Sequence, residues 1–418
     1  MFYDVFVDYY DSSSTLVFLF SELTNFIFCS IFLLILFYFK KLNYTELFVW
    51  LFGFLSIIFI VFVFDMQSLF PDSGGYLRCV RDIRDNFSFD EFGCQSTFQG
   101  FSTESETLSL PSHKRGLTGI LYAIVPIPFI TTLASLGVVN KIYLFGLYMF
   151  LRERLNNNQS KIILLFSFFL PTVLIYSSNG LRDNLIMVNQ VLLLFAIIEK
   201  RFLFSTFLLA ILFAIKTQNA LILSLLYFGV FIFRSHKSFA HLFVYSMVVF
   251  AVLIINQELI VSTLNYFRLA FINEEGGWGV PMTISADSVA YGSLGSLVLS
   301  SPLTFIKAMF APGLSLDIFN MIFFFESLVL IYILVKLVFL NNYFASSLNV
   351  LVFFVFVVGV CFNQLIVENV NTLLRYRYTF MYLFLFYVLF VYDSGSKKIN
   401  FPFLPRTKWS KVKGVSNI

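Results

Sequence analysis

The sequence predicts an all-α integral membrane protein with about eleven transmembrane helices, between ten and twelve, and two large extracytoplasmic loops. Apolar residues make up 59% of the 418 residues and charged residues only 12%, whereas a soluble domain carries about 25% charged residues. Apolar runs long enough to cross a bilayer recur along the chain. The basic residues also collect in alternate loops, as the positive-inside rule requires.

The apolar runs give the expected spans. Runs 183–198 and 202–215 are short, so these helices are expected to be tilted, broken or bordered by a polar cavity. The stretch 142–151 is too short to cross and is expected to be an interfacial helix. No repeat or linker divides the chain, so residues 1–418 are treated as one polytopic membrane domain. The expected spans are 16–39, 47–64, 117–139, 161–177, 183–198, 202–215, 219–233, 239–256, 317–339, 345–366 and 374–392.

Charge asymmetry predicts the orientation, with the N-terminus outside and the tail 393–418 in the cytoplasm. Outer loops are then expected at 65–116 and 257–316. An acidic N-terminal stretch, rather than a basic one, argues against a cleaved signal peptide. The expected cytoplasmic set holds 17 of the 28 basic residues: Lys40, Lys41, Lys141, Arg152, Arg154, Lys161, Lys200, Arg201, Arg234, Lys237, Lys336, Lys397, Lys398, Arg406, Lys408, Lys411 and Lys413.

The first outer loop opens with the motif Pro-Asp-Ser-Gly-Gly-Tyr-Leu-Arg over 71–78. Its glycine pair predicts a tight turn that presents Asp72 and Tyr76 at the membrane surface, with Arg78 beside them. The Asp72 carboxylate could act as a general base, or could hold a divalent cation together with Asp82 and Asp85. An ordinary Asx-turn at the end of a helix is the alternative.

Two polar interruptions mark the middle of the chain. Arg182 and Asp183 stand at the start of an apolar run, where charges are costly unless they face a polar cavity or each other. Lys216 and Gln218 interrupt the next pair of runs and indicate a polar pocket. The structural alternative is that Asp183 compensates a helix dipole and pairs only with Arg182.

Arg375 and Arg377 lie where the last span begins. Guanidinium groups suit bidentate contacts to phosphate, and at least one of the two is expected to be functional. Residues two apart do not share a helix face, so both can serve one ligand only if the helix is just beginning. Snorkelling of the arginines to the membrane surface is the alternative.

Cysteine and histidine usage gives little chemistry. Cys79 and Cys94 both fall in the first outer loop and could form a disulfide, whereas Cys29 and Cys361 lie in spans. Histidine and cysteine do not cluster with zinc-ligand spacing, so no metal site and no cofactor is expected, apart from the divalent cation considered above. The small net charge of +4 gives no reason to expect a nucleic-acid partner.

These motifs resemble those of bacterial polytopic envelope glycosyltransferases, namely Wzy-type O-antigen or capsule polysaccharide polymerases and C-type membrane glycosyltransferases. In the C-type class an acidic residue of the first large outer loop is the catalytic base, and Asp72 matches it here. Arg182-Asp183 and Arg375-Tyr376 are similar to pairs at a middle and at the last span of such enzymes. The chain departs from the pattern because its acid follows the second span and no Asp-x-Asp or Glu-x-Asp pair is present.

The resemblance implies a multi-pass glycosyltransferase of the bacterial inner membrane. It would transfer sugar or oligosaccharide from a polyprenyl-(di)phosphate-linked donor, such as undecaprenyl phosphate, to an acceptor glycan on the outer face, as in lipopolysaccharide or capsule synthesis. Other proteins of envelope-polysaccharide assembly could be further partners. A transporter or flippase for a lipid-linked oligosaccharide is the alternative, and a non-catalytic assembly protein is a third. Asp72, Arg182 and Asp183 are the expected catalytic residues; Tyr76, Arg78, Lys216, Gln218, Arg375 and Arg377 are expected to bind substrate.

Overall fold

The computed structural model is helical throughout the part of the chain that it describes. Within that part there are α-helices and one 3-10 helix but no strand, which confirms the all-α prediction there. Five helices are long and apolar enough to cross a membrane, or six if one bent pair counts as a single span. Eleven crossings stay a prediction. The described residues are 14–63, 72–86, 94, 116–233, 244, 247–248, 251, 254–277, 291–312, 318–340, 343–366 and 370–394.

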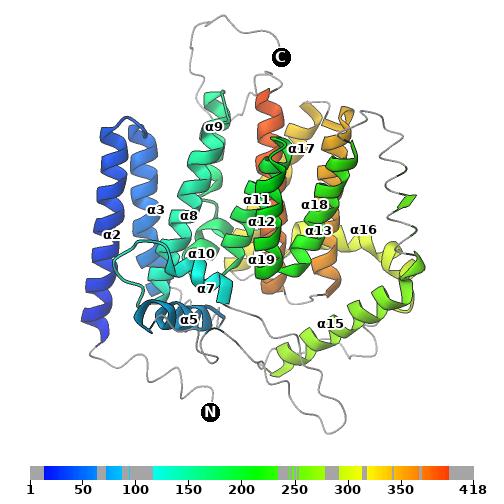
Figure 1. Ribbon diagram of the computed structural model, residues 1–418, viewed down its shortest axis with the longest axis horizontal. Helices are drawn as coiled ribbons and strands as arrows, with labels where there is room; N and C mark the ends of the chain where they lie inside the picture. Colours follow the sequence, from blue (N-terminus) through cyan, green and yellow to red (C-terminus); the bar gives the residue numbers. More distant parts are fainter. Residues whose placement is uncertain are drawn as a thin grey trace, which may run out of the picture.

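Three helices of the N-terminal half pack side by side (Figure 1). They are α2 (Ser14–Tyr38), α3 (Tyr44–Val63) and α8 (Leu133–Arg152). Helices α5 (Asp72–Asn86) and α7 (Gly116–Ala123) lie at one end of this bundle. We call that end the α5 face, and we call the opposite end, which carries the α2–α3 connection, the turn face.

The middle of the chain forms shorter helices. Helices α9 (Asn158–Ser167) and α10 (Pro171–Ser177) are bent by 54° at the break between them. They are followed by α11 (Asp183–Ile198), α12 (Phe202–Ile215) and α13 (Thr217–Phe233). Pro171 explains the break, because proline cannot donate the hydrogen bond that would continue α9.

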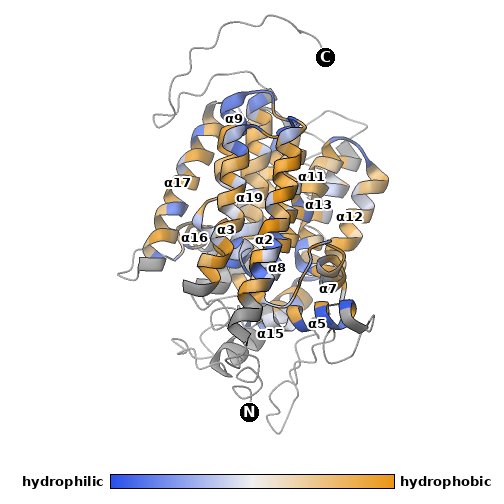
Figure 2. Ribbon diagram, turned by 90° about the vertical axis from the view of Figure 1, so that its left-hand side faces the viewer, coloured by the Kyte–Doolittle hydropathy of each residue, from blue (hydrophilic) through white to orange (hydrophobic). Residues whose placement is uncertain are grey.

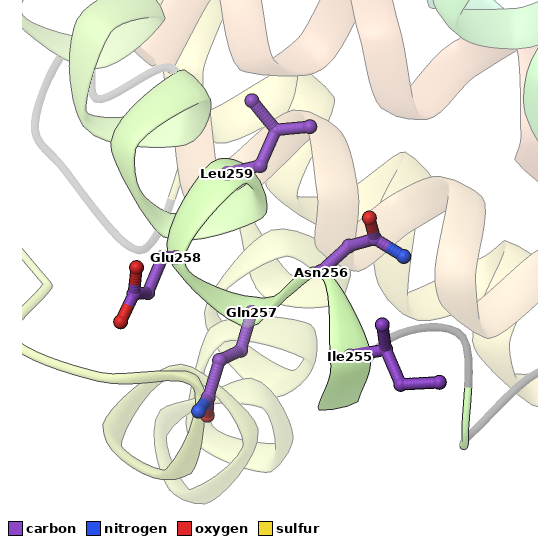
Figure 3. Close-up of a pocket in the computed structure, with 5 residues that line it drawn as sticks. All are labelled: Ile255, Asn256, Gln257, Glu258 and Leu259. Carbon is purple, nitrogen blue, oxygen red and sulfur yellow. The ribbon is translucent and has the colours of Figure 1, made fainter.

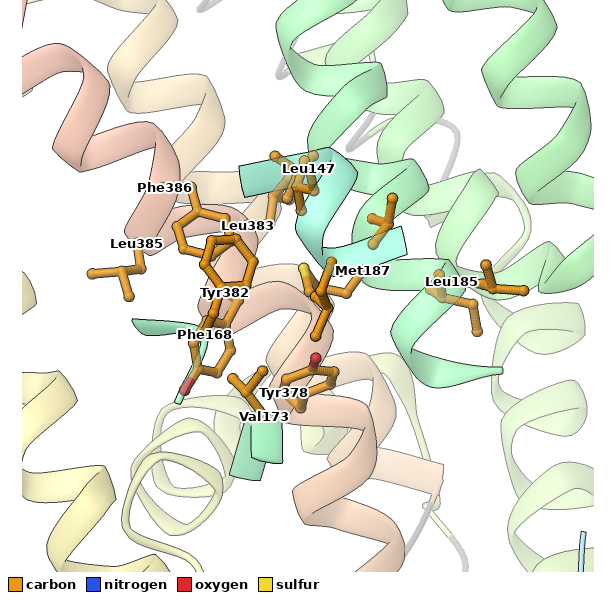
Figure 4. Packing of buried hydrophobic residues seen from close by; sticks show 14 of the residues in the cluster. Leu147, Phe168, Val173, Leu185, Met187, Tyr378, Tyr382, Leu383, Leu385 and Phe386 are labelled. Carbon is orange, nitrogen blue, oxygen red and sulfur yellow. The ribbon is translucent and has the colours of Figure 1, made fainter. Parts of the chain in front are cut away.

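The C-terminal half places its last helix at the centre of the protein. Helix α19 contacts α11, α17 and α18, and 78% of its most apolar window is buried. Its aromatic side chains form much of the core, where Phe386 lies 5.3 Å from Phe168 between ring centroids (Figure 4). The helices are α15 (Gln257–Gly277), α16 (Leu294–Phe310), α17 (Ile318–Leu340), α18 (Ser347–Ile366) and α19 (Val370–Ser394), with the 3-10 helix η2 (Tyr343–Ala345) before α18.

Apolar side chains also cover the outside of the bundle. Figure 2 shows hydrophobic residues along most of the length of the long helices and hydrophilic residues at α5. Phe20, Phe48 and Phe59 are each more than 60% exposed. A water-soluble surface would not carry so many large apolar groups, so this surface fits hydrocarbon.

The expected span 117–139 is not one helix. Helix α7 ends at Ala123, and the chain is irregular until α8 begins at Leu133. Pro126 and Pro128 explain the break, because each lacks a backbone N–H. The expected interfacial helix 142–151 is therefore wrong, since it forms the second half of α8.

This shift moves Lys141 from the expected cytoplasmic loop into the middle of α8. Its side chain is fully buried, and its ammonium group lies 5.6 Å from the centre of the Phe169 ring. The described part of the expected outer loop 257–316 is mostly helical, in α15 and α16, and its position outside the membrane stays a prediction. Most of the expected span 239–256, most of loop 65–116 and most of the tail 393–418 lie outside the described residues.

Polar contacts tie the helix ends together at the turn face. Arg152 donates to the carbonyl of Lys41 at 2.6 Å and forms an ion pair with Glu46 at 3.0 Å. Arg154 forms an ion pair with Glu199 at 2.6 Å. The α2–α3 connection, the end of α8 and the α11–α12 connection therefore lie at a similar level.

Candidate functional site

An ion pair between α11 and α19 forms the centre of the candidate site. Arg375 donates from Nε to the Oδ2 atom of Asp183 at 3.0 Å, and its Nη2 atom lies 2.9 Å from the same oxygen in an ion pair. The Asp183 side chain is 1% exposed and that of Arg375 is 15% exposed. Within the described residues the second oxygen of Asp183, Oδ1, has no hydrogen-bond partner. This carboxylate therefore keeps a buried acceptor that a ligand or water could use.

Two further cations surround the same carboxylate. Lys216 and Arg182 both interact electrostatically with Asp183. Arg182 is 8% exposed and donates to the carbonyl of Ile215 at 3.3 Å. The Lys216 ammonium lies 3.2 Å from the centre of the Tyr376 ring, and its side chain is also buried. Three cationic groups thus gather around one anion, which leaves an excess of two positive charges.

The turn before Arg182 is held by buried amides. Asn179 accepts the N–H of Leu181 through its side chain at 3.0 Å, and Asn140 of α8 donates to the Asn179 carbonyl at 2.6 Å. A Cβ atom on Gly137 would lie 2.4 Å from the carbonyl oxygen of Ser178, so α8 and this turn meet at a distance that only glycine allows. The position of Arg182 is consequently fixed by backbone contacts.

Helix α5 reaches the site through two tyrosines. Tyr76 is buried and packs edge-to-face on Tyr122 of α7, with 6.4 Å between ring centroids. The Tyr122 hydroxyl donates to the Leu181 carbonyl at 2.9 Å and to Asn140 at 3.1 Å. It also interacts electrostatically with Asp183. Tyr76 is therefore a buried packing residue linked to the site by one intervening ring.

Asp72 is the first residue of α5, so the expected glycine turn is instead the first turn of a helix. Tyr76 follows Asp72 by four residues in the same helix. The orientation of the Asp72 side chain lies outside what the structure describes. Arg78 is exposed on α5, and Gln218 is half-buried at the start of α13.

Arg377 does not join this cluster. Its Nη1 atom donates to the carbonyls of Ala308, Met309 and Ala311 at 2.8–3.1 Å, and its Nη2 atom donates to Ser327 at 2.9 Å. Three of these groups lie at the C-terminal end of α16, where carbonyls lack helical partners. Arg377 therefore fixes α16 to α19.

Glu326 of α17 is occupied in a similar way. Its carboxylate accepts the N–H and hydroxyl of Thr172 at 2.8 and 2.7 Å and the Tyr382 hydroxyl at 3.0 Å. Thr172 stands in the first turn of α10, so Glu326 caps that helix at the break after α9. Glu326 therefore stabilises the start of α10 at the break in this span.

Cys79 and Cys94 form a disulfide, which answers the question that the sequence left open. The Cys79 sulfur lies against α7, because a Cβ atom on Gly119 would lie 2.3 Å from it. Cys29 and Cys361 are free and buried. In the part of the chain that the structure describes, no group of three or more His, Cys, Asp or Glu residues is placed to hold a metal ion.

Several residues of the site were missed by sequence reasoning. Tyr122, Asn140 and Asn184 are polar residues within apolar helices, and Tyr378 donates to Asn184 at 3.1 Å. Polar residues inside apolar helices are themselves a signal, because an unsatisfied polar group in hydrocarbon is costly. Their partners come from α8, α11 and α19, so only the packing of these helices identifies the network.

A separate open pocket lies at the beginning of α15. It is lined by Ile255, Asn256, Gln257, Glu258 and Leu259 (Figure 3). None of these residues was expected in a site.

Comparison with known proteins does not identify the chain. No protein-family model, no curated protein and no solved structure matches it. The site geometry and the residue chemistry alone therefore support any assignment of function.

Proposed function

We propose that this protein is a membrane glycosyltransferase that uses a lipid-phosphate-linked sugar donor on its α5 face, as in polymerisation of O-antigen or capsule repeat units. The observation that supports the proposal is the gathering of Arg182, Lys216 and Arg375 around Asp183. A departing lipid phosphate needs cationic groups that are already in place. The excess of positive charge suits a dianion, and the acceptor would be a glycan.

In this proposal Asp183 orients the cations. Its ion pair with Arg375 fixes the orientation of the guanidinium group. Lys216 is held over the Tyr376 ring and acts as a point charge. Such preorganised charges lower the cost of phosphate departure because they need no rearrangement during the reaction.

Asp72 is the proposed general base for the acceptor hydroxyl. It begins the helix whose Tyr76 contacts Tyr122, next to the cluster. Tyr76, Arg78 and Gln218 would contribute to substrate binding around it. The α5 face would be periplasmic and the turn face cytoplasmic, in a bacterial inner membrane.

The cationic cluster is tested by lipid retention and by product formation. Lys216→Met and Arg375→Met should each reduce the polyprenyl phosphate that co-purifies with the protein, as measured by mass spectrometry, and should reduce glycan product in membranes. Arg201→Met is the matched control, because Arg201 is an exposed arginine at the turn face. Unchanged lipid retention in both cluster variants would contradict the proposal.

The role of Asp72 is tested separately. Asp72→Asn should leave the amount of protein unchanged and lower glycan product by about two orders of magnitude or more, which is the usual size of a general-base effect. Asp85→Asn and Glu274→Gln are the comparison variants, since either acid could serve in place of Asp72. Full activity in all three variants would argue against base-assisted transfer.

A flippase for a lipid-linked oligosaccharide is the second candidate, and Lys141 is the observation that favours it. This lysine is buried in the middle of α8, and within the described residues its ammonium group has no hydrogen-bond partner. Intramembrane charges of this kind mark ion and substrate paths. Lys141→Met should abolish lipid translocation in proteoliposomes if this candidate is correct, and should leave glycosyl transfer intact if it is not.

A further inference from the structure

Along the axis of α8, the Asp183 cluster lies nearer to the turn face than the first residue of α8 does. Asn184 donates to the carbonyl of Asn140 at 3.0 Å, so the start of α11 is level with that residue of α8. Residues 133–139 of α8 precede Asn140, and at 1.5 Å per residue they extend about 10 Å further toward the α5 face. Arg182 and Asp183 are recessed by a similar depth.

Helix lengths measured from the turn face give the same result. The Arg154–Glu199 ion pair sets the α11–α12 connection level with the end of α8. Helix α12 has 14 residues, so it rises only about 21 Å, whereas the hydrocarbon core of a bilayer is about 30 Å thick. With the α11–α12 connection at the opposite boundary, Lys216 and Thr217 lie about 8 Å short of the membrane boundary on the α5 face.

This recessed turn borders lipid. Thr217 is exposed, and Phe207, Leu221 and Phe228 on the same two helices are each more than 50% exposed. A flat bilayer would therefore place the polar α12–α13 turn against acyl chains, where polar groups are costly. Short hydrophobic segments relieve such mismatch by thinning the bilayer around them.

We propose that the α12–α13 turn indents the leaflet on the α5 face and brings the headgroup phosphate of a membrane lipid to the level of Lys216. The phosphate could belong to an ordinary phospholipid or to a polyprenyl phosphate, since both present the same anion. The inference deepens the proposed function, because it gives a lipid phosphate a lateral route to the cluster. The indentation itself follows from helix lengths and its test needs no enzymatic activity.

The test measures the surroundings of two matched positions. Thr217 and Phe207 lie at similar distances, about 8 Å, from opposite boundaries of a flat hydrocarbon layer. The variants Thr217→Cys and Phe207→Cys, in a background with Cys29 and Cys361 replaced by alanine, are labelled with a polarity-sensitive fluorophore. The full-length protein is reconstituted in phosphatidylcholine vesicles that carry nitroxides either at the headgroup or in the middle of the acyl chain.

The headgroup nitroxide should quench the label at 217 more than the mid-chain nitroxide does, and the label at 207 should show the opposite order. Equal behaviour of the two positions, with an apolar emission at 217, would overturn the indentation. With headgroup nitroxides on phosphatidylglycerol, Lys216→Met should weaken the quenching at 217. No change in that variant would overturn the recruitment of an anionic headgroup.

The source of the phosphate is distinguished by competition. Unlabelled polyprenyl phosphate added to the phosphatidylglycerol vesicles should restore the emission at 217 if it displaces the phospholipid, and unchanged quenching would assign the site to phospholipid. Loss of glycosyl transfer in the Asp72 or Arg375 variants has no effect on these depth measurements. The indentation and the proposed function can therefore fail separately.

Discussion

Arg375 and Arg377 stand two residues apart on α19 and have different surroundings. Arg377 is 3% exposed and gives its N–H groups to three carbonyls and one hydroxyl. Arg375 is partly exposed and contacts a carboxylate that keeps one oxygen without a hydrogen-bond partner in the described structure. Arg377 therefore has a structural role, whereas Arg375 belongs to a site that can still receive a ligand.

The difference comes from the helix. Residues i and i+2 point about 200° apart, so Arg375 faces α11 whereas Arg377 faces the end of α16. The sequence predicts at least one functional arginine without saying which. The contacts favour Arg375, because a guanidinium group that already satisfies several buried carbonyls cannot leave them without cost.

The largest expected effect on stability is therefore at Arg377. Arg377→Met should lower the free energy of unfolding by about 3–5 kcal/mol, because the buried carbonyls at the end of α16 lose their donor. Thermal unfolding in detergent measures this loss. A change of less than about 1 kcal/mol, as expected for an exposed arginine, would remove the distinction between the two residues.

A smaller loss is expected at Arg375. Arg375→Met should cost about 1–2 kcal/mol, since Lys216 and Arg182 still compensate the Asp183 carboxylate. Lipid retention should nevertheless fall. If Arg375→Met destabilises the protein as much as Arg377→Met does and lipid retention is unchanged, both arginines are structural.

The network beneath the site gives a third prediction. Tyr122→Phe removes the hydroxyl that contacts Leu181 and Asn140, and it should cost about 1 kcal/mol, the usual value for one buried hydrogen bond. Lipid retention at the Asp183 cluster should also weaken, because the turn before Arg182 is less well fixed. Tyr387→Phe is a matched control, since Tyr387 is also buried and its hydroxyl donates to Asn349 of α18 rather than to the turn before Arg182.

The smallest expected effect is an increase in stability. It is expected at Lys200, which is distant from both arginines, and it serves as a calibration of the unfolding assay. Lys200 follows α11 with a φ angle of 58°, in the left-handed region that favours glycine. Lys200→Gly should therefore stabilise the protein by about 0.5–1 kcal/mol. Lys161→Gly, within α9, should be destabilising by about 1 kcal/mol. Destabilisation by Lys200→Gly would show that the lysine side chain contributes more than its backbone strain costs.

Composition and apolar periodicity were sufficient to predict the class of protein and the position of most helices, because burial in hydrocarbon requires long apolar segments. They also indicated Arg182, Asp183, Lys216 and Arg375 as costly charges at helix ends. Sequence reasoning failed at 117–139, where Pro126 and Pro128 break an apolar run, and consequently misplaced Lys141. Hydropathy averaged over a window is insensitive to single proline residues.

The sequence by itself determined that this chain is helical, apolar and provided with a few charges at the ends of its helices. Only the tertiary structure decided which charges share a site. Asp183 and Arg375 are 192 residues apart, and their pairing depends on how α11 packs against α19. A pattern within one helix specifies the direction of a side chain, but its partner comes from another helix, and long-range packing alone brings the two together.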